Sequence, residues 1–320
     1  MRRSGGVALL LLGVVLAQGG KSWGRDVPQN QSESSQLESV RTYAPSDFHQ
    51  SLLDRLSGGL TQRSPSRLAA DSQGRILVTD PALSVVHVFD TQHGKRWQIH
   101  GDPRCPLRRP TYIAVDADDN IYVTDMGLYA VFVFQSSGRF LRTIGWGILN
   151  VPTGIWVDKP TGTLYVADWW KGQVMSFDSE GRLLQRFGTE GFGPGQLNGP
   201  SDVVLHSGIL VVLDAGNSRF DLFDLQGQFR GARPFGPNGT PAAYAFDDKE
   251  NLFYVDLDSG RLIAMDSKGK VLARFGQLPG AGAVFRCVAV DAIGDILALG
   301  PALNIETVKL ASAASGSAPQ

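Results

Sequence analysis

Residues 164–188 run Leu164-Tyr-Val-Ala-Asp-Trp-Trp-Lys-Gly-Gln-Val-Met-Ser-Phe-Asp-Ser-Glu-Gly-Arg-Leu-Leu-Gln-Arg-Phe-Gly188. An apolar run ends in Asp168, an alternating run ends in Asp178, and a third run ends at Phe187. Gly, Asp and Ser separate the three runs. Short apolar or alternating runs with this punctuation are typical of strands joined by hairpins. The stretch therefore predicts three consecutive antiparallel strands.

The same pattern recurs along the chain. First strands end in Asp or a substitute at Leu68–Asp71, Ile113–Asp116, Ile155–Asp158, Val203–His206, Tyr244–Asp247 and Val288–Asp291. Second strands close at Asp80, Asp125, Asp168, Asp214, Asp256 and, in the sixth copy, Gly300. These closing positions lie about 44 residues apart, a period typical of four-stranded propeller blades. The sequence therefore predicts an all-β fold, a six-bladed β-propeller of four-stranded antiparallel blades.

The sixth copy is one strand short. It ends after a third strand at Ile305–Leu310, so we predict that an N-terminal strand at Leu37–Tyr43 completes the last blade and removes an exposed sheet edge. We expect a helix at Asp47–Leu56, because its apolar residues fall on one face. The propeller then spans 37–310, with 37–62 holding the closing strand and the helix. The blades cover roughly 63–107, 108–150, 151–198, 199–236, 237–284 and 285–310.

The two ends of the chain differ from the repeats. Arg2 and Arg3 precede the apolar run Val7–Ala17, which is short for a membrane span and fits a secretory signal. We expect a signal peptide at 1–20, a flexible lead-in at 21–36 and a disordered tail at 311–320. The alternative is a retained membrane anchor. The favoured interpretation predicts a secreted or periplasmic protein whose mature chain has no membrane span.

Composition limits the partners. The formal net charge is −1, whereas a nucleic-acid-binding domain is usually basic, so we expect no nucleic-acid partner. The two cysteines, Cys105 and Cys287, could form a disulfide in an oxidising compartment or could be unrelated small residues.

Two strings identify a family resemblance. Tyr165–Phe177 and Pro110–Asp116, together with the Asp-x-x-Gly turns, resemble the NHL repeat. The resemblance extends from Arg63 to Leu310 and implies a six-bladed β-propeller. It does not select a function, because such propellers bind ligands, bind proteins or act as enzymes.

No pattern in the sequence indicates a catalytic centre. The Asp residues that close the second strands could suggest a metal ring, but Asp at a strand end usually caps the following turn. The five histidines occupy different positions in different blades, whereas a zinc site needs converging ligands. We therefore predict no catalytic residue, no metal and no cofactor.

The candidate ligand-binding residues come from propeller geometry. Residues just before each first strand should ring the channel mouth, and the loops between second and third strands lie on the same face. The candidates are Arg67, Arg109, Tyr112, Tyr129, Trp146, Trp169, Trp170, Lys171, Asp202 and Arg286. Aromatic and Arg side chains on an exposed rim suit binding. The alternatives are core packing for Trp169 or Trp170, and solvation or pairing with Asp202 for the arginines.

We predict a monomeric, non-catalytic module that binds a protein, peptide or glycan through this face. One alternative is a propeller enzyme, a lyase or hydrolase with an axial pocket. Another is a structural component of a cell-envelope complex.

Overall fold

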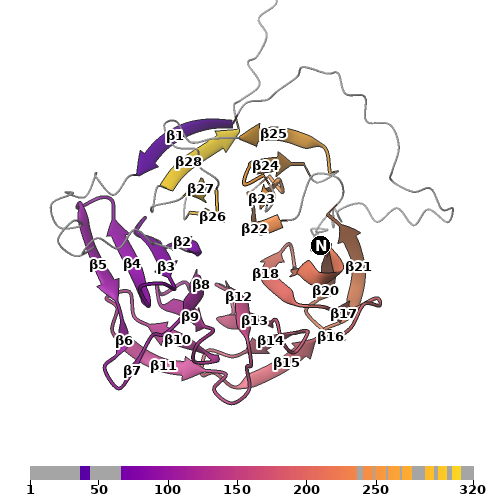
Figure 1. Ribbon diagram of the computed structural model, residues 1–320, viewed down its shortest axis with the longest axis horizontal. Coiled ribbons are helices and arrows are strands. Elements are labelled where there is room, and N and C mark those ends of the chain that lie inside the picture. Colours follow the sequence, from indigo (N-terminus) through magenta and orange to yellow (C-terminus); the bar gives the residue numbers. More distant parts are fainter. Residues whose placement is uncertain are drawn as a thin grey trace, which may run out of the picture.

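The chain forms a ring of six four-stranded antiparallel sheets around a central axis (Figure 1). The computed structural model describes residues 37–43, 66–235, 241–247, 249–256, 259–266, 269–275, 285–291, 295–300 and 305–310. These residues contain no α-helix, only a short 3-10 turn, η2, at Ala215–Asn217. The predicted six-bladed, all-β propeller is therefore confirmed.

Five blades use consecutive strands that run from the axis outwards. Blade 1 holds β2 (Leu68–Ala70), β3 (Ile76–Asp80), β4 (Val85–Asp90) and β5 (Lys95–Ile99). Blade 2 holds β8 (Pro110–Val115), β9 (Ile121–Asp125), β10 (Ala130–Phe134) and β11 (Phe140–Ile144). Blade 3 holds β12 (Pro152–Asp158), β13 (Thr163–Asp168), β14 (Gln173–Phe177) and β15 (Leu183–Phe187). Blade 4 holds β18 (Pro200–His206), β19 (Ile209–Asp214), β20 (Arg219–Asp224) and β21 (Phe229–Pro234). Blade 5 holds β22 (Pro241–Phe246), β23 (Leu252–Asp256), β24 (Leu262–Met265) and β25 (Val271–Phe275).

Blade 6 is built from both ends of the described chain. Its strands are β26 (Cys287–Val290), β27 (Ile296–Leu299) and β28 (Ile305–Leu310), and β1 (Leu37–Tyr43) lies outermost. β1 pairs antiparallel with β28, in a register that sets Leu37 opposite Leu310 and Tyr43 opposite Ile305. The expected signal peptide, lead-in, helix at Asp47–Leu56 and C-terminal tail lie outside the described residues.

The core lies between neighbouring blades. All five residues of β9 and of β10 are buried, because the middle strands of a blade are covered on both faces by adjacent sheets. Tyr122 and Val131 of blade 2, for example, pack in one cluster with Ile155 and Val166 of blade 3. A fully buried Phe, Val or Ile side chain contributes about 1.5–3 kcal/mol to stability. The apolar runs of the sequence thus hold the blades together side by side.

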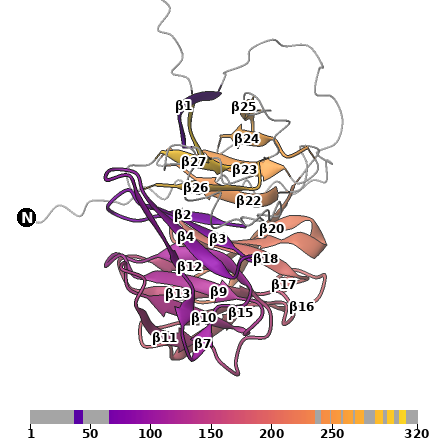
Figure 2. The same cartoon turned by 60° about the vertical axis from the view of Figure 1, so that its left-hand side comes forward.

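Alternating strand direction gives the ring two faces, and Figure 2 shows the blades from the side. The loop face carries the loops between second and third strands and the connections to the next blade. The connections include a hairpin of β6 (Gly101–Asp102) and β7 (Cys105–Pro106), and a parallel pair of β16 (Thr189–Glu190) and β17 (Gln196–Leu197). The turn face carries the tight turns between first and second and between third and fourth strands.

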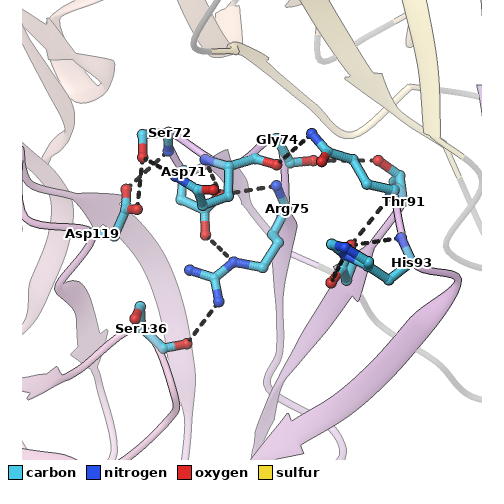
Figure 3. A network of polar contacts seen from close by, with 11 residues as sticks. Asp71, Ser72, Gly74, Arg75, Thr91, His93, Asp119 and Ser136 are labelled. Carbon is cyan, nitrogen blue, oxygen red and sulfur yellow. Dashed lines mark hydrogen bonds and ion pairs between the residues drawn. The ribbon is translucent and has the colours of Figure 1, made fainter.

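Polar contacts on the turn face join blade 1 to blade 2 (Figure 3). The backbone N–H and the hydroxyl of Ser72 donate to the carboxylate of Asp119 at 2.9 and 2.7 Å. Arg75 Nη1 donates to the carbonyl oxygen of Ser136, and Arg75 Nε donates to Asp71. The backbone N–H groups of Gln73 and Arg75 also donate to Asp71, so this Asp is a turn residue, as predicted. This face is therefore organised by structural hydrogen bonds.

No helix among the described residues is long and apolar enough to cross a membrane.

Candidate functional site

The loop face is held in shape by the Asp residues that close the second strands. Asp125 is fully buried and accepts hydrogen bonds from the backbone N–H groups of Gly127 and Leu128 at 2.8 and 3.1 Å. These bonds confirm the predicted role as a turn cap. The same carboxylate also accepts from the backbone N–H groups of Arg108 and Arg109. One Asp thus fixes two loops. The sequence predicted its bonds to the turn into the third strand, but not its bonds to the connection that carries Arg108 and Arg109.

Asp168 performs the same task in blade 3. Its carboxylate accepts from the backbone N–H groups of Asn150 at 2.6 Å, Val151 at 3.1 Å and Lys171 at 3.1 Å. These donors belong to the connection that carries Trp146 and to the loop that follows Asp168. A buried carboxylate therefore sets the positions of two loops that carry exposed tryptophans.

An axial cluster of Arg67, Tyr112, Asp202 and Cys287 lies near the start of the innermost strands, at the loop-face end of the central axis. Arg67 Nη2 donates to the hydroxyl of Tyr112 and to the carbonyl oxygen of Ala242, both at 2.7 Å. Arg67 Nη1 donates to the carbonyl oxygen of Ser66, and the guanidinium lies 4.2 Å from the centre of the Tyr112 ring. Arg67 therefore links blade 1 to blade 2 and, across the ring, to blade 5.

Electrostatics in the axial cluster are dominated by burial. Desolvation raises the pKa of Asp202 to about 6, although Arg67 and the backbone N–H of Val203 oppose this shift. Burial also raises the pKa of Tyr112 and of Cys287 above their ordinary values. For Arg67 burial disfavours the cation, but attraction by Tyr112, Cys287 and Asp202 leaves its pKa raised. Arg67 remains charged, and its donors Nη1 and Nη2 are used within the propeller.

The structure places the predicted ring residues together at the channel mouth. Gly154 faces Asp202 so closely that a Cβ on Gly154 would lie 2.3 Å from the Asp202 Cα, so this position excludes a side chain. Asp202 is 8% exposed. Arg67 is half-buried and its Nη1 and Nη2 are bonded within the ring, so the solvation alternative does not hold for it. The charges of Arg67 and Asp202 attract each other, although no ion pair at 4.0 Å or less joins these two described residues. Arg286 precedes Cys287 and is exposed at the same mouth.

The outer part of the loop face carries exposed aromatic side chains, which we call the aromatic rim. Its members and exposed fractions are Tyr129 51%, Trp146 59%, Trp169 48%, Trp170 63% and Phe192 76%. Neither Trp169 nor Trp170 is enclosed in the core, although one side of Trp169 packs against Gly199. Their ring centres lie 6.4 Å apart at an interplanar angle of 40°.

Contacts between neighbouring loops make the blade 3 part of the rim continuous. Lys171 Nζ donates to the carbonyl oxygen of Ile148, and the Trp169 backbone N–H donates to that of Val151 at 2.9 Å. The Trp169 indole lies directly over Gly199, where a Cβ would come within 2.6 Å of Nε1. Gly172 approaches Glu190 equally closely, so the tryptophan loop touches the connection that carries Phe192. Trp146, Trp169, Trp170 and Phe192 therefore come from three loops, and the loop that carries Trp169 and Trp170 contacts the other two.

Phe192 is presented by a connection that blade 4 holds firmly. Arg219 Nη2 donates to the carbonyl oxygens of Gly193 and Gln196, both at 2.8 Å, and Nη1 donates to that of Phe192 at 3.3 Å. Arg219 Nε lies 3.0 Å from a carboxylate oxygen of Asp221 and 3.3 Å from one of Asp214. Both carboxylates are fully buried, and burial together with Asp214 raises the pKa of Asp221.

Phe192 was missed by the sequence analysis. It lies in the Gly-rich string Gly188–Gly195, which reads only as a loop between blades. The sequence did contain one signal for Phe192: it is a large apolar residue among glycines, and its neighbours in the sequence have no side chains that could cover it.

The other candidates are distributed around this face. Arg109 is exposed beside the Tyr129 loop, since a Cβ on Gly127 would contact both Arg108 and Arg109. Lys171 is half-buried and bonded to Ile148.

The disulfide alternative for the cysteines is not what the structure shows. Cys105 and Cys287 are both free, and they pack in different core clusters. Cys105 lies on the hairpin after blade 1, whereas Cys287 lies on the innermost strand of blade 6. Among the described residues, no group of His, Cys, Asp and Glu is arranged to hold a metal ion.

Comparisons with known proteins agree with this fold. No family model matches the chain. Human E3 ubiquitin-protein ligase NHLRC1 is 30% identical over 129 residues, which cover 38% of this chain and 31% of that protein. Protein brain tumor of Drosophila melanogaster is 30% identical over 135 residues, covering 41% of this chain and 13% of that protein. The chain thus matches less than a third of the length of either relative.

Solved structures show the same architecture at low identity. A streptogramin B lyase superposes with a TM-score of 0.61 at 12% identity, covering 79% of this chain and 95% of that one. A gluconolactonase from Xanthomonas campestris gives 0.62 at 17% identity, covering 78% and 86%. A chain of a nidogen/laminin complex gives 0.57 at 24% identity, covering 67% and 81%. At these identities the likeness concerns the fold alone.

Proposed function

Since the chain is an NHL-repeat six-bladed β-propeller, we propose that it is a non-catalytic module that binds a protein partner through the aromatic rim. The observation that carries this proposal is the set of Trp146, Trp169, Trp170 and Phe192, which are exposed on three neighbouring loops of one face. Tryptophan and other aromatic residues dominate the energetics of protein interfaces. Large exposed apolar groups gathered on one surface mark interaction sites.

The way in which the rim is built supports binding. Asp168 and Arg219 fix the backbones of the loops through buried hydrogen bonds, while the rings themselves remain exposed. A surface ordered before binding loses less conformational entropy when the partner arrives. The ligase activity in the name of the human relative is not carried into the proposal, because the match covers 31% of that protein.

Affinity capture tests the proposal. The immobilised wild-type chain, Trp170→Ala and Phe192→Ala are incubated with extract from the native compartment, and retained proteins are quantified. We expect each substitution to weaken retention of a specific partner by about tenfold or more, as for a central aromatic anchor. Leu184→Ala on β15 and Leu225→Ala on the turn face are matched controls, since both side chains are exposed elsewhere. Equal retention by all variants would place the binding surface outside the rim.

We also propose that the chain acts outside the cytoplasm, in a secreted or periplasmic location. The support is the charged start and short apolar run of residues 1–20. Sequencing the N-terminus of the chain recovered from its native source tests this. A new N-terminus near residue 20 supports export, and recovery of an uncleaved chain from the cytoplasm contradicts it.

A further inference from the structure

The exposed charged side chains of the described residues are mainly basic, although the formal net charge is only −1. On the loop face the exposed charged side chains are mainly basic and include Arg104, Arg108, Arg109, Arg261 and Arg286. On the turn face, the Asp residues that begin the tight turns, such as Asp116 and Asp178, are half-buried and bonded within their turns, and the exposed charged side chains that the structure describes there are also mainly basic. Several cations of the turn face are paired with turn carboxylates, for example Arg182 with Asp178 and Arg230 with Asp224.

Two of the arginines on the loop face are free to bind a partner. The guanidinium groups of Arg108 and Arg109 make no hydrogen bond or ion pair with any residue that the structure describes. Their backbone N–H groups, in contrast, are fixed by Asp125. The same blade presents Tyr129, and Gly127 in the Tyr129 loop lies against both arginines. Blade 2 thus offers two positioned cations next to an exposed aromatic ring.

Arg104 differs from this pair. It is highly exposed but already bonded to Asp102 through Nε and Nη2. It therefore adds less attraction for an incoming anion than Arg108 and Arg109 do.

The arrangement favours an acidic peptide segment over a nucleic acid. Nucleic-acid backbones bind through many phosphate contacts, commonly about six to ten. Here the unpaired cations are few, and Glu190 lies exposed between the tryptophan loop and Phe192. A phosphodiester chain crossing the rim would meet this carboxylate. A peptide can place apolar residues there and confine its carboxylates to blade 2.

We propose that the partner contributes a segment in which acidic residues accompany apolar or aromatic ones. The carboxylates pair with Arg108 and Arg109, which can each form two parallel hydrogen bonds to a carboxylate. The apolar side chains contact Trp146, Trp169, Trp170 and Phe192. This inference rests on the proposed function and specifies the chemistry of the partner.

The test uses the full chain and three fluorescent probes. The first is a short synthetic peptide of Glu, Leu and Trp, the second has Lys in place of every Glu, and the third is polyuridine. Fluorescence anisotropy is measured with the wild type and with the double variant Arg108→Glu, Arg109→Glu. The double variant Lys159→Glu, Lys249→Glu on the turn face is the control, because both lysines are exposed and far from the rim.

We expect the acidic peptide to bind the wild type about tenfold or more tightly than the Lys peptide. Charge reversal at Arg108 and Arg109 should remove this preference, and the lysine control should keep it. Raising the salt to about 0.5 M should weaken binding, since exposed charges are screened. Equal binding of both peptides would overturn the proposal. Binding of polyuridine that depends on the two arginines, without binding of the acidic peptide, would overturn it in favour of a nucleic acid.

The result is separable from that for the proposed function. If Trp170→Ala and Phe192→Ala abolish capture of a partner but charge reversal at Arg108 and Arg109 does not, the rim binds a partner of different chemistry. If neither set of variants affects capture, the proposed function itself fails.

Discussion

The axial cluster and the aromatic rim lie on the same face of the propeller, yet their side chains are used differently. In the axial cluster, Arg67 binds Tyr112 and the backbone of blade 5, and Asp202 is almost completely buried. On the rim, the rings of Trp146, Trp170 and Phe192 are mostly exposed. The backbones of their loops are held by hydrogen bonds to Asp168 and Arg219. Both sets contain residues of the types found in binding sites. Only on the rim are these side chains exposed to a partner. Residue type alone therefore does not distinguish side chains that hold the ring together from side chains that can bind a partner.

The strongest test of this comparison is Arg67→Ala. We expect it to lower the free energy of unfolding by about 3–4 kcal/mol, because the Tyr112 hydroxyl and the Ala242 carbonyl lose a charged partner. Chemical denaturation measures the change. Arg104→Ala is the control, because an ion pair made by a highly exposed side chain contributes little to stability. A negligible effect of Arg67→Ala would mean that the axial arginine is not structural and is again a candidate for ligand binding.

The variant Asp168→Ala tests whether buried structural hydrogen bonds order the loops of the aromatic rim. We expect a loss of about 2–3 kcal/mol, because the backbone N–H groups of Asn150, Val151 and Lys171 lose their common acceptor. The same change should speed hydrogen exchange at these three amides and weaken partner binding. Asp178→Ala, a turn-face residue of the same blade, should leave these amides protected. Retained protection in Asp168→Ala would show that the rim loops are ordered by something else.

The pH dependence of stability provides a test of the axial cluster. Burial raises the pKa of Asp202 to about 6 in the folded chain, above its ordinary value of 3.8. Below about pH 3 the group is mostly protonated in both the folded and the unfolded chain. As pH rises towards 6 the unfolded chain ionises first, so the free energy of unfolding falls, by at most about 1–3 kcal/mol, and then levels off.

Asp202→Asn should remove this fall and make the variant the more stable form above pH 6. Denaturant titrations between pH 4 and 8 measure both curves. Asp178→Asn is the opposite control, because the pKa of Asp178 is lowered, chiefly by the Arg182 backbone N–H. Its stabilising contribution is present above its ordinary pKa and is lost as the pH falls. Parallel curves for wild type and Asp202→Asn would contradict the assigned role of burial.

The smallest effect on stability is expected on the rim. Trp170→Ala should change the free energy of unfolding by no more than about 0.5 kcal/mol, because the ring is 63% exposed and packs mainly against Trp169. Thermal unfolding of the variant beside the wild type measures this. A large loss of stability would place Trp170 with the structural residues and remove the contrast between the two regions.

Part of the candidate site could be predicted from sequence. The repeated Asp residues and their spacing placed the second-to-third-strand loops on one face, and Tyr129, Trp169 and Trp170 lie there as expected. The ring residues Arg67, Tyr112 and Asp202 also followed from position alone. Phe192 did not, because a Gly-rich connection has no periodicity and its shape depends on Arg219 in the next blade.

The sequence by itself determined the number of blades, the ends of the second strands and the turn role of the Asp residues, whereas most first strands begin about three residues earlier than predicted. These features are local: an apolar run, a turn residue and a fixed period act over a few residues. Only the tertiary structure decided which side chains stay exposed and can bind a partner. Arg67 bonds to Ala242, 175 positions away in the chain, and Trp169 rests on Gly199 in the connection to blade 4. Such contacts exist only once the ring brings distant blades together, because burial and pairing are properties of the packed chain.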